Sequence, residues 1–114
     1  MYLTYDKDSQ VLIVRLTGDL DHHNASKARN QIDESIILKK PRKVIFDLSA
    51  LSFMDSSGIG IIMGRYRLMK EYNAEVAICG VGTNIRKLID ISGLKTIVKE
   101  YNTAEEAIWE AEKV

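Results

Sequence analysis

The distribution of apolar residues along the chain predicts five β-strands. Short apolar or alternating runs bounded by turn-forming residues are typical of strands. Such runs occur around Leu3 and Tyr5 and at residues 11–16, 44–48, 75–79 and 96–98. The polar residues 6–9 predict a tight turn between the first two strands, which are therefore expected to form an antiparallel hairpin. Gly18 is expected to end the second strand.

Four longer segments between these strands carry apolar residues at helical spacing. They are residues 25 to about 40, 56 to about 72, 83–92 and 104 onward. The first helix is expected to be capped by Asp21 or Asn24, both favoured at this position. Gly93 has the position of a C-cap after the third helix. Residues 49–53, between the third strand and the second helix, are expected to form a loop.

The alternation of strands and helices indicates the fold class. Helices between apolar strands act as crossover connections, which make the second, third and fourth strands parallel. We therefore expect a single α/β domain over residues 1–114, with a mixed sheet of about five strands and about four helices. Three loops should gather at the carboxyl edge of the parallel strands: residues 18–24, 49–58 and 80–84. Asp21 and Ser56 are then expected to be neighbours at that edge.

Composition and charge exclude several classes of partner. Lys plus Arg and Asp plus Glu both total 16, so the formal net charge is zero, whereas a nucleic-acid-binding protein needs a basic surface. No apolar run is long enough to span a membrane, and no signal segment opens the chain. Cys79 is the single cysteine, which fits a reducing compartment. We therefore expect a cytoplasmic protein that binds neither nucleic acid nor membranes.

Three glycines at the start of the second helix suggest a dinucleotide-binding fingerprint. That motif needs its glycines directly after a strand and an acidic residue at the end of the next strand. Gly58, Gly60 and Gly64 have a different spacing, and the next strand ends with Cys79 and Gly80. No cofactor is therefore expected. Gly60 and Gly64 are instead expected to let the helix approach the sheet closely, or to form part of a partner surface.

A serine at a strand–turn–helix junction can also be a nucleophile. Ser56 or Ser57 would take that role, with His22 or His23 as the base. However, Met54 occupies the position where the nucleophile-elbow motif requires its first glycine, and no oxyanion-binding loop accompanies the serines. We therefore expect no catalytic residues and no enzymatic activity.

The acidic and histidine residues of segment 19–23 could ligate a metal ion. The candidates are Asp19, Asp21, His22 and His23. Adjacent histidines at a helix start are expected to diverge, and no second pair of ligands stands elsewhere in the sequence. No metal site is therefore expected.

The remaining role for the serines is that of a helix cap or a modified side chain. Asp55, Ser56 and Ser57 are all favoured N-cap residues, so one of them is expected to cap the helix. A helix needs only one cap residue, whereas this segment offers three candidates followed by Gly58 and Gly60. The excess indicates an exposed partner-binding loop that can be phosphorylated. These patterns alone do not distinguish Ser56 from Ser57.

The same segment resembles a known family. Residues 51–58, Leu-Ser-Phe-Met-Asp-Ser-Ser-Gly, resemble the signature of the STAS domain of bacterial anti-sigma factor antagonists. Residues 17–23 and 91–94 also match family positions. The Asp-His-His run and the Phe-Met-Asp-Ser-Ser-Gly-Ile-Gly segment are most similar to the sporulation members, which antagonise the anti-sigma-F factor.

The resemblance implies a partner switch in which this chain holds no cofactor. The unphosphorylated antagonist binds an anti-sigma factor that is also a serine protein kinase, and so releases the sporulation sigma factor. The kinase phosphorylates the antagonist, which dissociates, and a PP2C-type phosphatase restores it. The family's phosphate acceptor maps to Ser56. The alternative is a STAS scaffold module that is not phosphorylated.

The expected partner-binding residues lie at the start of the second helix and in the neighbouring loop. They are Asp21, Asp55, Ser56, Ser57, Gly58 and Gly60. Asp21 is included because the topology places it beside Ser56. A phosphate at Ser56 is expected to block this surface without refolding the chain.

Overall fold

A five-stranded sheet forms the centre of the computed structural model, which describes residues 1–112. Its strands are β1 (Tyr2–Asp6), β2 (Val11–Leu20), β3 (Lys43–Met54), β4 (Glu75–Cys79) and β5 (Lys99–Tyr101), in this spatial order. β1 is antiparallel to β2, and the other neighbouring pairs are parallel. The expected mixed sheet, with an N-terminal hairpin and a parallel centre, is therefore confirmed.

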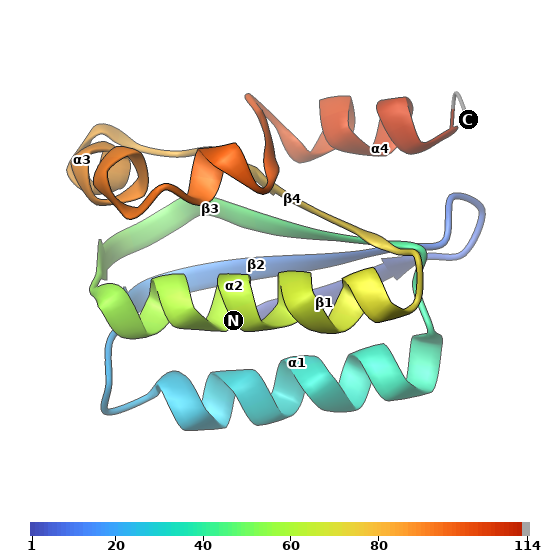
Figure 1. Cartoon of the computed structure of the whole chain (residues 1–114), viewed down its shortest axis with the longest axis horizontal. Helices are drawn as coiled ribbons and strands as arrows, with labels where there is room; N and C mark the ends of the chain where they lie inside the picture. Colours follow the sequence, from blue (N-terminus) through green and yellow to red (C-terminus); the bar gives the residue numbers. More distant parts are fainter. Residues whose placement is uncertain (113–114) are drawn as a thin grey trace.

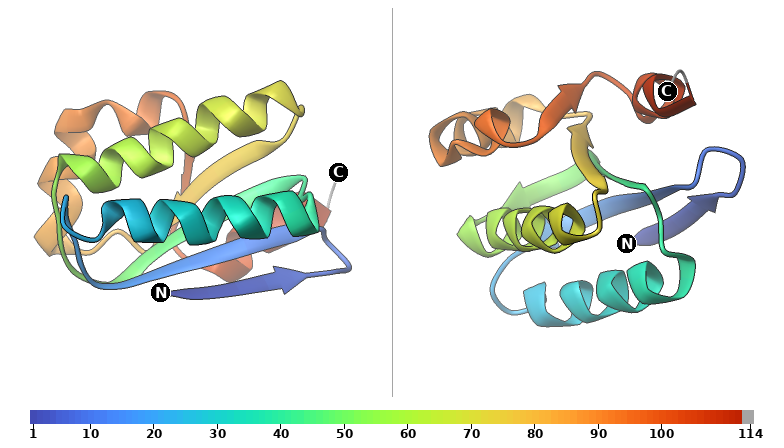
Figure 2. Two further views of the ribbon diagram at one scale, coloured as in Figure 1. Left: turned by 90° about the horizontal axis from the view of Figure 1, so that it is seen from below. Right: turned by 45° about the vertical axis from the view of Figure 1, so that its right-hand side comes forward.

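Four α-helices cover the two faces of this sheet. They are α1 (Ala25–Lys39), α2 (Ser56–Glu71), α3 (Thr83–Ser92) and α4 (Ala104–Glu112), with a short 3₁₀ turn, η1 (Leu94–Thr96), after α3. α1 and α2 run side by side below the sheet in Figure 1, and α3 and α4 lie above it. The views in Figure 2 show the same two layers. The number and order of the helices agree with the sequence-based expectation.

The strands bury side chains on both faces because successive residues point to opposite sides. Leu12 and Val14 of β2 join the larger apolar core together with residues of α1 and α2. Their neighbour Val11 instead joins a smaller core in which Ala104 and Ala107 of α4 take part. This two-sided burial explains why the central strands read as continuous apolar runs.

β2 and β3 both extend beyond their predicted ends. Gly18 does not end β2: its positive φ of 67° accompanies a register shift between Gly18 and Asp19, and pairing with β3 resumes to Leu20. A glycine adopts this left-handed conformation at low cost, so it can form an irregularity inside a strand. The expected loop at residues 49–53 is likewise wrong, because these residues continue β3 to Met54. They pair with β2 beyond the last residue of β4.

The last strand was expected at residues 96–98 but is formed by Lys99–Tyr101. Gly93 caps α3 in the left-handed conformation, as expected, and the chain then turns through η1. The Val98 side chain is buried, which explains its strand-like pattern. Its amide, however, donates to the carbonyl of Leu94 at 3.0 Å and closes the turn. The strand begins only after this turn is complete.

Candidate functional site

The N-terminus of α2 is capped by Asp55. Its backbone is extended, and its carboxylate accepts a hydrogen bond from the Ser57 amide at 2.8 Å. Of the three candidate caps, the aspartate therefore does the capping. The Ser56 side chain, the first of the helix, is exposed, whereas Ser57 is half-buried. Ser56 is thus the accessible hydroxyl of the pair.

The end of β2 lies against this helix start. The Asp55 amide donates to the carbonyl of Leu20 at 3.2 Å, which brings the following residue, Asp21, to the same edge as Ser56, as the topology predicted. The Asp21 carboxylate accepts hydrogen bonds from the amides of His23 and Asn24 at 3.0 and 3.3 Å. These bonds order the turn that leads into α1.

Asn24 stabilises the same turn but does not cap α1 with its side chain. It is the residue before the helix, and its side chain makes no cap hydrogen bond. Its amide group instead donates to the carbonyl of Asp19 at 2.7 Å and accepts from the Asp21 amide at 3.0 Å. Both predicted cap candidates therefore hold the turn, and neither acts as a conventional side-chain cap.

The Asp55 carboxyl is held in its ionised form. Desolvation raises its pKa, but hydrogen bonds from the Ser57 and His22 amides, the Ser57 side chain and the charge of His22 together lower the pKa below its ordinary value. A negative charge therefore stands next to Ser56 at neutral pH. Its interaction with the partial positive charge of the helix N-terminus is favourable.

The two histidines do not diverge as expected. The imidazole rings of His22 and His23 lie with their centroids 3.9 Å apart, tilted by 38°. Within residues 1–112, no three His, Cys, Asp or Glu side chains form a group suited to a metal ion.

No helix in this part of the chain has the length and apolar character needed to cross a membrane.

The three glycines of α2 have different surroundings. A Cβ at Gly58 would lie 2.3 Å from Cγ of Met54 and 3.1 Å from Cδ2 of Leu20, so the helix start packs tightly on the strand ends there. A Cβ at Gly60 or Gly64 would meet nothing within 4 Å. The expected close approach to the sheet is therefore wrong for Gly60 and Gly64. Both line a surface groove instead.

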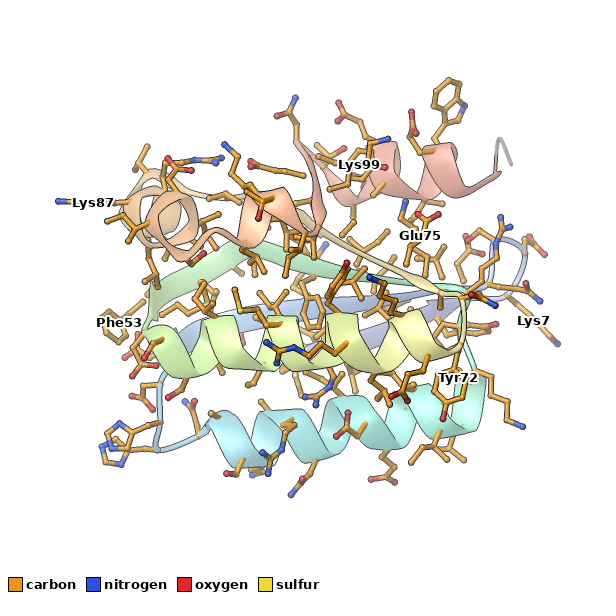
Figure 3. The ribbon with its side chains drawn as sticks, viewed as in Figure 1. Lys7, Phe53, Tyr72, Glu75, Lys87 and Lys99 are labelled. Atoms are coloured by element: carbon orange, nitrogen blue, oxygen red, sulfur yellow. The ribbon has the colours of Figure 1, made fainter. Side chains whose placement is uncertain are left out.

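Two further residues belong to this edge and were missed from the sequence. Phe53 is 51% exposed, and Figure 3 shows it beside the start of α2, at the end opposite Tyr72. Asn84, at the start of α3, donates to the carbonyls of Leu51 and Ser52 at 3.1 and 2.7 Å. No local signal marks the Phe53 ring as exposed, because its neighbours in the sequence are the polar Ser52 and the apolar, buried Met54.

Comparisons with known proteins agree with this architecture. Residues 2–107 match the STAS domain family. An anti-sigma F factor antagonist from Paenibacillus polymyxa is 43% identical over 104 residues, which cover 91% of this chain and 89% of that protein. The structure of the anti-sigma factor antagonist SpoIIAA in its unphosphorylated form has a TM-score of 0.82 at 29% identity, covering 99% of this chain and 98% of that one.

The phosphorylated form of the Bacillus cell fate determinant SpoIIAA is also similar. Its TM-score is 0.71 at 30% identity, with 96% of this chain and 98% of that chain covered. The agreement extends over nearly the whole sequence. The resemblance read from the signature residues is therefore confirmed, and the chain belongs to the STAS domain family.

Proposed function

We propose that this chain is an anti-sigma factor antagonist that works by partner switching, with Ser56 as its phosphate acceptor. One observation supports Ser56 above all: it is the exposed hydroxyl at the start of α2, next to a separate capping residue, Asp55. The similar antagonist from Paenibacillus and the two forms of SpoIIAA support the same function.

The unphosphorylated chain binds an anti-sigma factor that is also a serine protein kinase, and so releases a sporulation sigma factor. The kinase then phosphorylates Ser56, the complex dissociates, and a PP2C-type phosphatase removes the phosphate. The chain contributes no catalytic group and no cofactor. The partner contacts the edge formed by the Asp21 turn and the α2 start: Asp21, Asp55, Ser56, Ser57, Gly58 and Gly60.

The phosphate acts on the interface more strongly than on the fold. It adds about 1.5–2 negative charges. At the N-terminus of a helix an added negative charge contributes about 0.3–1 kcal/mol of stability, so α2 does not melt. An unpaired charge at a close interface costs about 2–5 kcal/mol, which is roughly 30- to several-thousand-fold in affinity. The larger effect blocks binding and leaves the fold in place.

Intact-mass measurement after incubation with the cognate anti-sigma kinase and ATP tests this function. We expect wild type and Ser57→Ala to gain one phosphate and Ser56→Ala to gain none. Ser56→Ala should still bind the kinase, because its cap at Asp55 is intact. A phosphate on Ser56→Ala would move the acceptor to Ser57. No phosphate on wild type would favour the alternative, a STAS scaffold module.

A further inference from the structure

A surface groove runs between α1 and α2 away from the start of α2. It has a volume of about 470 Å³. The lining residues that matter here come from both helices: Ser26, Arg29, Ser57, Gly60, Gly64 and Arg65. The groove thus begins at the half-buried serine beside the proposed phosphate acceptor, and continues the proposed partner surface along the helices.

The groove is open because two positions on α2 carry no side chain. Nothing lies within 4 Å of the place where a Cβ would stand at Gly60 or Gly64. Glycine weakens a helix relative to alanine, and no close packing requires either glycine. Open space between the helices is the structural result of these two residues.

The groove carries positive charge that its own residues do not balance. Nε of Arg65 lies 3.0 Å from Oδ1 of Asp33, and the Arg65 side chain is only 12% exposed. Among residues 1–112, Asp33 is the only carboxylate in an ion pair with Arg65 or Arg29. Nη1 of Arg65 is buried and makes no hydrogen bond to any described residue. Arg65 is therefore paired with one carboxylate, and Arg29, which lines the same groove, is in no ion pair with another of residues 1–112.

The pKa of the Arg65 guanidinium depends on its burial and on the charges of Asp33 and Arg29. Burial lowers its pKa, the Asp33 carboxylate raises it, and the positive charge of Arg29 lowers it again. Arg29 is therefore close enough to repel Arg65 electrostatically, although its own side chain is exposed. An oxyanion between the two arginines would relieve this repulsion.

The carboxylates of Asp21 and Asp55, near the start of α2, do not balance the positive charge of Arg29 and Arg65. Asp21 accepts the amides of His23 and Asn24, and Asp55 accepts the amide of Ser57. Both belong to turns that fix the backbone. Neither carboxylate is in an ion pair with Arg29 or Arg65 among the described residues, so an anion of a partner would meet positive charge that these two do not balance.

We propose that this groove receives a carboxylate side chain of the anti-sigma factor, with Arg29 as its main contact. The inference rests on the proposed function and adds a specific acidic contact to it. Arginine binds carboxylates through paired, charge-assisted hydrogen bonds, and the hydroxyls of Ser26 and Ser57 supply further donors. A carboxylate suits the site because opposite charges across an interface fix its register.

Charge reversal on α1 tests the contact. Affinity for the anti-sigma factor is measured by titration calorimetry for wild type, Arg29→Glu and Lys27→Glu. Lys27 is the matched control, because it lies on the same helix but lines a different hollow. We expect Arg29→Glu to weaken binding about tenfold or more and Lys27→Glu to change it less than about twofold. Melting temperatures of both variants should stay near that of wild type.

Filling the groove gives an independent readout. Gly64→Gln places a side chain in the open space and removes a glycine from the helix, so we expect a higher melting temperature together with weaker binding. A purely structural role would not move the two quantities in opposite directions. An acidic residue of the anti-sigma factor whose change to Arg restores binding to Arg29→Glu would identify the bound carboxylate.

The outcomes separate this inference from the proposed function. If wild type binds and Arg29→Glu binds equally well, or no worse than Lys27→Glu, the acidic contact is wrong and the partner switch stands. If Gly64→Gln binds like wild type, the groove is not part of the interface. If wild type itself does not bind the anti-sigma factor, the proposed function fails, and the contact fails with it.

Discussion

The Asp55 carboxylate accepts a hydrogen bond from the Ser57 amide at 2.8 Å. This bond distinguishes the residue that caps the helix from the residue proposed to carry the phosphate, which the sequence alone did not do. The aspartate caps α2, so the hydroxyl of Ser56 is not needed to hold the helix start. The exposed hydroxyl can therefore be modified or replaced without loss of the cap. We therefore expect a charge on Ser56, the proposed acceptor, to act on binding and to leave the helix cap in place.

We predict that Ser56→Asp weakens binding to the anti-sigma factor by roughly 30-fold or more and leaves the melting temperature almost unchanged. The added carboxylate would lie at the proposed interface, but beside a helix N-terminus that favours negative charge. Calorimetric titration gives the affinity, and circular dichroism gives the melting curve. Ser56→Ala is the control and should bind like wild type. A clear loss of helical signal in Ser56→Asp would contradict the interface-block mechanism.

We predict opposite effects of alanine at two glycines of α2. Gly58→Ala should destabilise the fold by about 1–3 kcal/mol, because its Cβ would lie 2.3 Å from Cγ of the buried Met54. Gly60→Ala should stabilise it by about 0.5–1 kcal/mol, because its Cβ meets open space. Urea denaturation measures both. Equal stability of the two variants would show that the Met54 contact relaxes without cost.

The helices could be predicted from the sequence because their signals are local. Gly93 ends α3 and Pro41 follows α1, so neighbours in the sequence set both boundaries. The end of β3 could not be predicted in this way, because residues 49–54 become a strand only by pairing with β2, which is distant in sequence. Ser49 and Ser52 also interrupt the apolar pattern that marks a strand.

The residues of the candidate site were also only partly predictable from the sequence. The resemblance selected Ser56, and the topology placed Asp21 at the same edge. Asn84 was missed because its role depends on carbonyl groups of β3 that only the folded chain brings near. The groove at Gly60 and Gly64 was missed because a glycine pattern alone does not show whether its backbone meets a sheet or open space.

We predict that Asp47 makes stability depend on pH in the acid range. Burial raises the pKa of this carboxyl, but hydrogen bonds from the Ser49 amide and hydroxyl and from Arg15 outweigh burial and hold the pKa below its usual 3.8. Because the folded-state pKa is the lower one, the stabilisation is complete above the unfolded-state pKa. It is lost as the pH falls through the folded-state pKa.

Urea denaturation between pH 2 and pH 7 checks this prediction for wild type and Asp47→Asn. The variant should be less stable at neutral pH and should lose less stability on acidification. Ser49→Ala, which removes the hydroxyl at 2.7 Å but keeps the amide, should fall between the two. Parallel pH profiles for wild type and Asp47→Asn would show that this carboxyl does not contribute to the acid response.

We predict that the Cys79 thiol is unreactive in the folded protein and reports on the opening of α4. Burial, the charge of Asp47 and a hydrogen bond to it raise its pKa to about 12. At pH 8 the thiolate population is then roughly a thousandfold below that of a thiol with the ordinary pKa of 9.0. The side chain is also fully buried, in the core that includes Ala104 and Ala107 of α4.

An aromatic disulfide reagent at pH 8 should therefore label Cys79 slowly without denaturant and completely in urea, with Cys79→Ala as the blank. Ala107→Gly loosens the packing of α4 on the sheet and should raise the native labelling rate. If α4 opens locally, that rate rises at urea concentrations below the global transition. If labelling instead follows the global transition alone in both proteins, α4 unfolds together with the sheet and is not a separate unit.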